Sequence, residues 1–234
     1  MRRLGTLALV VAAVAVAAAV ALAAQSPRAL RNGIAAAARS QHSVHWQGTD
    51  VVGGARALTG ADVSTSEGSQ HVTFYLGKTQ AHVLIRVVDH TAYVNGDALG
   101  LRLNLGLTSA QATKYAGQWI SIPKTAKLYA GTAEADTLGS LVSSIVPRGN
   151  VKAFSAKLHG SRVVGVRSVH GKGKKKTLQV LEARAHGKRL PLEEDEVTPG
   201  MNAISRTVLS RWNETVQVQA PANAVPISTV LGQT

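Results

Sequence analysis

The chain has 234 residues, no cysteine and a formal net charge of +13. Without cysteine it has neither disulfides nor thiol chemistry, so its stability must come from burial alone. The charge surplus favours an anionic membrane surface as a partner. An aromatic content of only 4% argues against nucleic acid, which single-strand binders hold by stacking on aromatic side chains. The alternative that the basic residues only solubilise the protein stays open.

Residues 1–24 are predicted to be a membrane-targeting segment. Arg2 and Arg3 precede an uncharged run of Ala, Val and Leu that ends at Ala24, and this is the pattern of a secretory signal. Small residues at its end fit cleavage after Ala23 or Ala24, but a run of about 20 apolar residues can also span a bilayer. The protein is therefore predicted to be exported, either secreted or anchored by this uncleaved segment, with residues 25–234 as its one domain.

The first part of that domain predicts one helix followed by a hairpin. Residues 25–40 are expected to be helical after Pro27, because apolar side chains recur there on one helical face. From Ser43 the apolar residues alternate instead, which indicates a strand. The Gly53-Gly54 pair then supplies a favoured hairpin turn.

Three further strands are predicted in the next part. Alternating apolar residues mark strands over 71–76 and 81–87, with residues 77–80 as the turn between them. A short third strand over 91–94 ends at Asn95-Gly96, a favoured tight-turn dipeptide. An antiparallel meander is the economical arrangement of these strands.

Helical signals return in the middle of the chain. Thr108 and Gln111 have the spacing of a capping box, and Gly117 is a suitable C-terminal stop. Residues 132–146 carry the clearest amphipathic pattern of the domain, and Pro147 ends it. This apolar stripe needs an apolar partner, so we expect the 132–146 helix to lie on one face of the sheet.

The C-terminal third is predicted to return to strands separated by glycines. They are expected at residues 151–158, 162–169, 177–184, 203–212 and 215–220. The acidic run 193–196 lacks the ligand spacing of a calcium loop and is predicted to be a solvated turn. The basic run 171–176 is predicted to be an exposed hairpin tip. An antiparallel sheet with helices on one face gives the fold class α+β.

No motif in the sequence predicts catalysis or a cofactor. The chain has eight histidines, and His42 and His45 form an H-x-x-H pair, but a zinc site needs three or four convergent ligands. No G-x-S-x-G elbow and no phosphate-binding glycine loop occurs. The protein is therefore predicted to be neither an enzyme nor a metal protein. The three tryptophans are expected to pack in the core or at its rim, or alternatively to form the lip of a lipid pocket.

Three local phrases carry a family resemblance. They are AYVNGD at 92–97, AGQWISIP at 116–123 and WNETVQVQAP at 212–221. With the order of export signal, helix, meander, helices and strands, the chain resembles the actinobacterial envelope lipoproteins of the LppX/LprG type, within the LolA-like lipoprotein-carrier fold. In that family a lipobox cysteine follows a Leu-small-small triplet. Here Gln25 follows Leu22-Ala23-Ala24, so a role that depends on lipid anchoring is not expected.

The resemblance implies a strongly curved antiparallel half-barrel sheet, with helices covering its concave face and an apolar cavity between them. It also implies an envelope or secreted protein that binds a lipid or lipoconjugate, with a carrier role as one form of this function. Mapped onto this chain, an apolar or acyl-chain ligand would contact Val72, Phe74, Val83, Ile85, Leu138, Leu141, Val142 and Ile145. The alternative is a non-catalytic structural or regulatory interaction module, in which the same residues fill an ordinary core.

Overall fold

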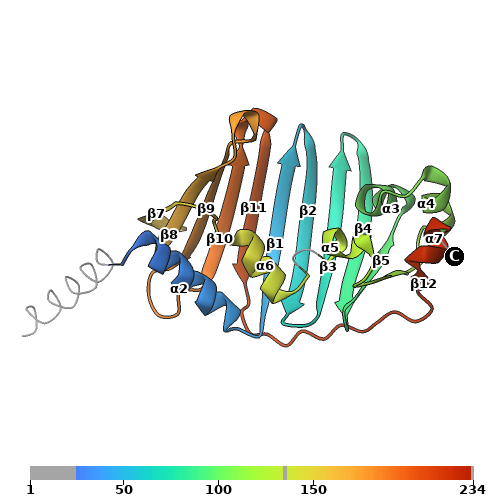
Figure 1. The fold of residues 1–234 in the computed structure, drawn as a ribbon, viewed down its shortest axis with the longest axis horizontal. Helices are drawn as coiled ribbons and strands as arrows, with labels where there is room; N and C mark the ends of the chain where they lie inside the picture. Colours follow the sequence, from blue (N-terminus) through green and yellow to red (C-terminus); the bar gives the residue numbers. More distant parts are fainter. Residues whose placement is uncertain (1–24, 134–135, 233–234) are drawn as a thin grey trace, which may run out of the picture.

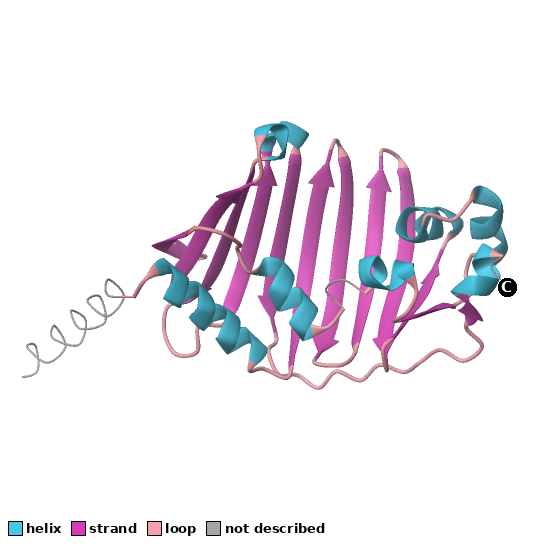
Figure 2. Ribbon diagram, in the orientation of Figure 1, coloured by secondary structure: helices cyan, strands magenta, loops and turns pink. Residues whose placement is uncertain are grey.

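The computed structural model describes residues 25–133 and 136–232. They form one open, curved sheet of 12 strands with helices in front of it (Figures 1 and 2). Neighbouring strands follow the order β12-β6-β5-β4-β3-β2-β1-β11-β10-β9-β8-β7. Every pair is antiparallel except β12 with β6. The predicted α+β class is confirmed.

The first six strands are β1 (Ser43–Val52), β2 (Ala55–Ser64), β3 (Gly68–Leu76), β4 (Thr79–Val88), β5 (Thr91–Gly96) and β6 (Ile120–Pro123). The others are β7 (Val151–Leu158), β8 (Ser161–His170), β9 (Thr177–Arg184), β10 (Pro191–Thr198), β11 (Ala203–Ser210) and β12 (Val225–Pro226). The helices are α2 (Pro27–Arg39), α3 (Ala98–Leu105), α4 (Ser109–Tyr115), α5 (Lys127–Thr132), α6 (Leu138–Ile145) and α7 (Ile227–Leu231), with short 3-10 turns η1 (Gly173–Lys175) and η2 (Pro199–Met201).

The helix predicted after Pro27 and the first hairpin are confirmed. The Ser26 side chain accepts a hydrogen bond from the Ala29 N–H, and Pro27 occupies the first turn of α2, both of which favour a helix start. Gly53 and Gly54 join β1 to β2 with φ of 57° and 90°. These left-handed values suit glycine, which has no Cβ to clash.

The turn predicted at Asn95-Gly96 is wrong. Both residues belong to β5, and Asp97 begins helix α3 instead, because its carboxylate accepts a hydrogen bond from the Gly100 N–H at 2.7 Å. Gly96 is needed here for a close approach rather than for a turn. A Cβ at this position would lie 2.6 Å from the His82 carbonyl oxygen.

The helix predicted over 132–146 is shorter than expected. It begins at Leu138, where Thr137 and Ser140 form a capping box, and Thr132 instead ends the separate helix α5. The capping residue sets the start. The apolar stripe of α6 packs on the sheet as predicted, because all four of its apolar residues are buried.

Two predictions for the C-terminal third are wrong. The acidic run 193–196 lies in β10, where Glu193 and Glu194 are buried. Residues 215–220 form no strand and belong to a long connection along one edge of the molecule (Figure 1). Two side chains, rather than a neighbouring strand, hold this connection in place. The Glu67 carboxylate accepts a hydrogen bond from the Val218 N–H at 3.1 Å, and Arg86 donates one to the Gln219 carbonyl at 3.2 Å.

The predicted targeting segment, residues 1–24, lies outside the described residues. Across residues 25–133 and 136–232, none of the helices combines the length and the apolar character that crossing a membrane requires.

Candidate ligand-binding face

The side chains on the concave face form rows across the sheet, because paired residues of neighbouring strands point to the same side. One row runs Leu209, Trp46, Ala61, Gln70, Ile85, Val94 and Ile120. The next runs Val44, Val63, Gly68, Val87, Ala92 and Ile122. The helices in Figure 2 cover these rows.

The buried apolar residues of this face fall into two separate clusters. The first joins α2 and α6 to β1, β2, β8, β9 and β11. The second joins α3, α4 and α7 to β3, β4, β5 and β6. In the two rows above, strand β3 marks the border: Gln70 separates Ala61 of the first cluster from Ile85 of the second, and Gly68 separates Val63 from Val87. We call this border the seam.

Asp136, two residues before α6, lies at the seam. Its carbonyl oxygen sits so close to Gly68 that a Cβ there would approach it to 2.1 Å. The Asp136 side chain is fully buried, and neither carboxyl oxygen has a hydrogen-bond partner among the described residues. Burial raises the pKa of Asp136 well above its usual value, since a charged carboxylate is costly in a low-dielectric site.

A second polar group at the seam also lacks a partner. The side-chain oxygen of Gln70 is buried and accepts no hydrogen bond within the described part of the chain. A neutral Asp136 can donate a hydrogen bond, and an amide oxygen can accept one. The seam therefore holds unused hydrogen-bonding capacity between two apolar surfaces.

The eight residues predicted to contact a ligand lie on both sides of the seam. The four on α6 belong to the first cluster. Val72, Val83 and Ile85 belong to the second, and half-buried Phe74 packs against it. Apart from Phe74, all are buried. The structure thus brings them to one face of the sheet but not around one shared surface.

Sequence reasoning missed a buried polar link beside α6. The Gln179 amide donates to the Glu194 carboxylate at 3.0 Å and to the Ser144 carbonyl of α6 at 3.2 Å. Burial raises the pKa of Glu194 to about 7, and the nearby acidic side chains add to the shift. The signal that could have found it is the spacing of Gln179 within a predicted strand, where it shares a face with Leu181 and Ala183.

The tryptophans differ in their surroundings. Trp46 is buried in the first cluster with its indole N–H unpartnered among the described residues. The Arg86 guanidinium lies over the half-buried Trp119, with its Cζ 4.8 Å from the centroid of the indole ring. Half-buried Trp212 packs at the margin of the first cluster. Trp46 is therefore the tryptophan best placed to report on the concave face.

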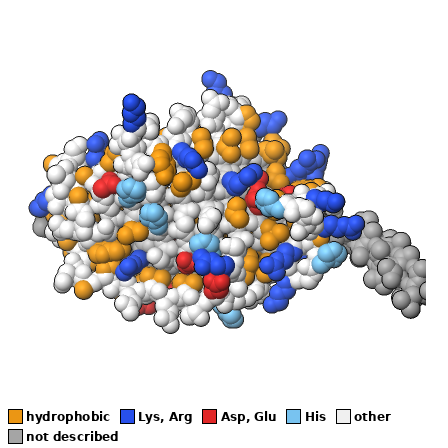
Figure 3. Space-filling view, turned by 180° about the vertical axis from the view of Figure 1, so that it is seen from behind, with side chains coloured by type: hydrophobic (Ala, Val, Ile, Leu, Met, Phe, Trp, Pro, Cys, Tyr) orange, Lys and Arg blue, Asp and Glu red, His pale blue; other side chains and the backbone are white. Residues whose placement is uncertain are grey.

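The histidines do not assemble into a metal centre within residues 25–133 and 136–232, where no three His, Asp or Glu side chains converge. His45 pairs with Asp62 at 2.8 Å. The His71 and His82 rings stack with centroids 6.4 Å apart beside a groove of about 480 Å³ that also includes Leu84. Basic, acidic, histidine and apolar side chains are mixed on the face behind the helices (Figure 3).

Comparison with known proteins rests on structure alone. No family model and no curated protein matches the sequence. Among solved structures, LprF from Mycobacterium bovis aligns with 84% of this chain and 97% of its own, at 14% identity and a TM-score of 0.51. The lipoprotein LppX from Mycobacterium tuberculosis aligns with 80% of this chain and 95% of its own, at 14% identity and a TM-score of 0.50. The chain shares their fold.

Proposed function

We propose that this protein is an exported, non-catalytic lipid-binding protein that takes the acyl chain of a lipid or lipoconjugate at the seam. The observation that carries the proposal is the division of the concave face into two apolar clusters. Each cluster is packed within itself, so an acyl chain can insert between the two apolar surfaces at their border. A neutral Asp136 carboxyl can then donate a hydrogen bond to an oxygen of the ligand, and the Gln70 side-chain oxygen can accept one from a ligand hydroxyl.

Entry of the ligand requires the helices α5 and α6 to move. Helices α5 and α6 have only 6 and 8 residues, and helices this short have little stability without tertiary packing. The apolar residues of α6 would then contact one side of the acyl chain. Val72, Val83 and Ile85 would contact the other side. The fold shared with LprF and LppX supports this proposal at the level of architecture.

A second candidate is a structural or regulatory module with a filled core. The burial of Leu138, Leu141, Val142 and Ile145, each at most 2% exposed, favours it. This alternative predicts that the purified protein contains no lipid and binds none.

Titration of the full chain with a fluorescent fatty acid, beside native mass spectrometry of co-purified lipid, separates the two candidates. The acyl-chain proposal predicts saturable binding that Leu141→Asp abolishes. In a closed core this charge destabilises by several kcal/mol, so the thermal melt of each variant is recorded as well. Leu103→Asp, at an exposed site on α3, is the matched control. A wild-type protein that binds no fatty acid would contradict the proposal.

A further inference from the structure

Two stretches of the chain carry basic side chains and no acidic ones, and we call the elements that they build the basic side. No Asp or Glu occurs from residue 25 to 49 or from residue 137 to 181. These two stretches build α2, α6, β7 and β8, and α2 packs against the other three. Their basic residues are Arg28, Arg31, Arg39, Arg148, Lys152, Lys157, Arg162, Arg167, Lys172, Lys174, Lys175 and Lys176. A surplus of positive charge attracts anionic surfaces.

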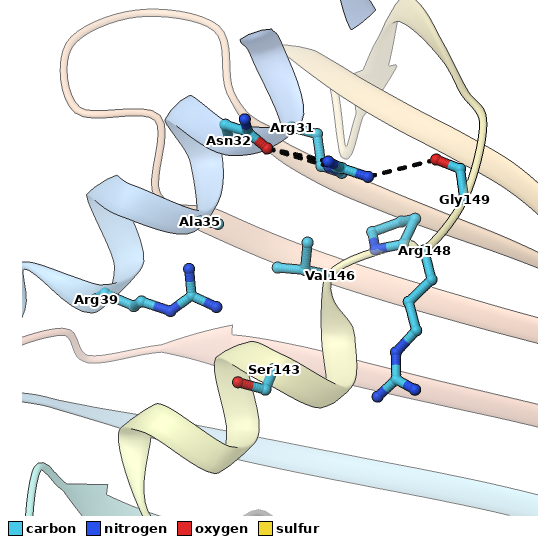
Figure 4. Close-up of a pocket in the computed structure, with 9 residues that line it drawn as sticks. Arg31, Asn32, Ala35, Arg39, Ser143, Val146, Arg148 and Gly149 are labelled. Carbon is cyan, nitrogen blue, oxygen red and sulfur yellow. Dashed lines mark hydrogen bonds between the residues drawn. The ribbon is translucent and has the colours of Figure 1, made fainter. Parts of the chain in front are cut away.

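Within this basic side, α2 and α6 enclose a groove of about 490 Å³. Figure 4 shows Arg39 reaching in from α2 and Arg148 from the segment after α6. Val146 and Pro147 supply apolar lining beneath them. We call this the arginine groove. It offers guanidinium groups next to apolar side chains. A phospholipid has the matching arrangement, with a charged headgroup next to apolar chains.

The arginines of the groove have no acidic partner among the described residues. Arg31 is held in place by its own hydrogen bonds, to the Asn32 side chain at 3.2 Å and the Gly149 carbonyl at 3.4 Å. The side chains of Arg39 and Arg148 are exposed and make no hydrogen bond within the described part of the chain. Arginine binds phosphate oxygens through paired N–H groups, so both side chains are available for that contact.

The place of the groove in the chain favours a membrane as the source of the phosphate. The apolar segment that the sequence assigns to membrane targeting ends at Ala24, and α2 begins at Pro27. The first folded element after that segment is therefore the one that presents Arg31 and Arg39. We propose that the arginine groove binds the phosphate headgroup of an anionic phospholipid and docks the basic side of the protein on the membrane surface.

The test uses the full chain held in neutral detergent micelles. Isothermal titration compares the same micelles carrying phosphatidylglycerol or phosphatidylcholine. Binding is expected with phosphatidylglycerol alone. The double variant Arg39→Gln/Arg148→Gln should weaken it roughly thirtyfold, because each arginine at an anionic surface contributes ~1 kcal/mol and 1.4 kcal/mol is tenfold.

The matched control is Arg162→Gln/Arg167→Gln, which removes the same charge from exposed positions on β8 and should retain most of the affinity. Equal weakening in both double variants, or no preference for phosphatidylglycerol, would overturn the groove as a site. If inorganic phosphate competes with phosphatidylglycerol at an equal concentration, the groove is a site for free anions and membrane docking is contradicted. Fatty-acid binding at the seam should be unchanged in both variants, so failure of this proposal is distinguishable from failure of the proposed function.

Discussion

At the scale of single residues, Glu194 makes the stability depend on pH. Burial raises its pKa to about 7, so the folded protein holds this proton more tightly than the unfolded chain does. Its contribution is full below pH 4.5 and is lost as pH rises through about 7. A shift of this size corresponds to about 3 kcal/mol. Glu194→Gln should therefore be more stable than wild type at pH 8 and similar to it near pH 4.5.

Urea unfolding at both pH values measures this difference. Other carboxyls with raised pKa, such as Glu182 and Glu193, leave a residual pH dependence in the variant. Glu214→Gln, at an exposed site, is the control and should keep the wild-type profile. A Glu194→Gln variant whose profile also matches wild type would show that Glu194 is ionised without cost.

Gly68 lies against the Asp136 carbonyl at the seam. Gly68→Ala would place a Cβ 2.1 Å from the Asp136 carbonyl oxygen, and the backbone must move to relieve it. We expect a loss of about 1–3 kcal/mol in the free energy of unfolding and faster fatty-acid uptake. In Gly60→Ala, on the adjacent strand, the added Cβ meets no atom within 4 Å. This variant should change neither the free energy of unfolding nor the rate of fatty-acid uptake. Stopped-flow fluorescence measures the uptake, and equal rates for both variants would argue against entry at the seam.

The sequence predicted apolar positions better than polar ones. The stripe Leu138, Leu141, Val142 and Ile145 has helical spacing, and burial follows from that spacing alone. The burial of Glu194 and Asp136 depends on which elements pack above them, so no local pattern reveals it. An acidic run is normally solvated, and here the β-ladder overrides that preference.

At the scale of elements, the capping box of α6 should control access to the seam. Thr137 and Ser140 fix the start of this helix, and Thr137→Ala should cost about 1 kcal/mol. Because α6 borders the seam, the variant should take up fatty acid faster. Thr108→Ala removes the equivalent cap from α4, away from the seam, and should lose similar stability without the faster uptake. Chemical denaturation and stopped-flow mixing of both variants provide the comparison.

Element boundaries were predictable where a residue has one structural use. Gly53-Gly54 and the Thr108–Gln111 capping box were assigned correctly because each satisfies a local backbone need. Asn95-Gly96 was misassigned because the same dipeptide that favours a turn also permits the close backbone contact that β5 makes with His82. Residues 215–220 alternate like a strand, but they pair with no strand, and the side chains of Glu67 and Arg86 hold their backbone along the edge of the molecule.

At the scale of the whole molecule, the sheet is continuous but the apolar packing is not. The α+β class and the helix-covered face followed from strand alternation and the apolar stripes. The division into two clusters could not be predicted, because it depends on the register that places Gly68 and Gln70 of β3 between apolar neighbours. The proposed lipid binding depends on this division, because the acyl chain must enter between the two clusters.

The most direct test uses Trp46, which shares a row with Gln70 across Ala61. Trp119→Phe/Trp212→Phe leaves Trp46 as the only tryptophan of the full chain. Its fluorescence is then followed as a fatty acid brominated in mid-chain is added, with the unbrominated acid as control. Binding at the seam predicts saturable quenching by the brominated acid alone. Unchanged Trp46 fluorescence in a folded protein that has bound the acid would contradict the seam as the site.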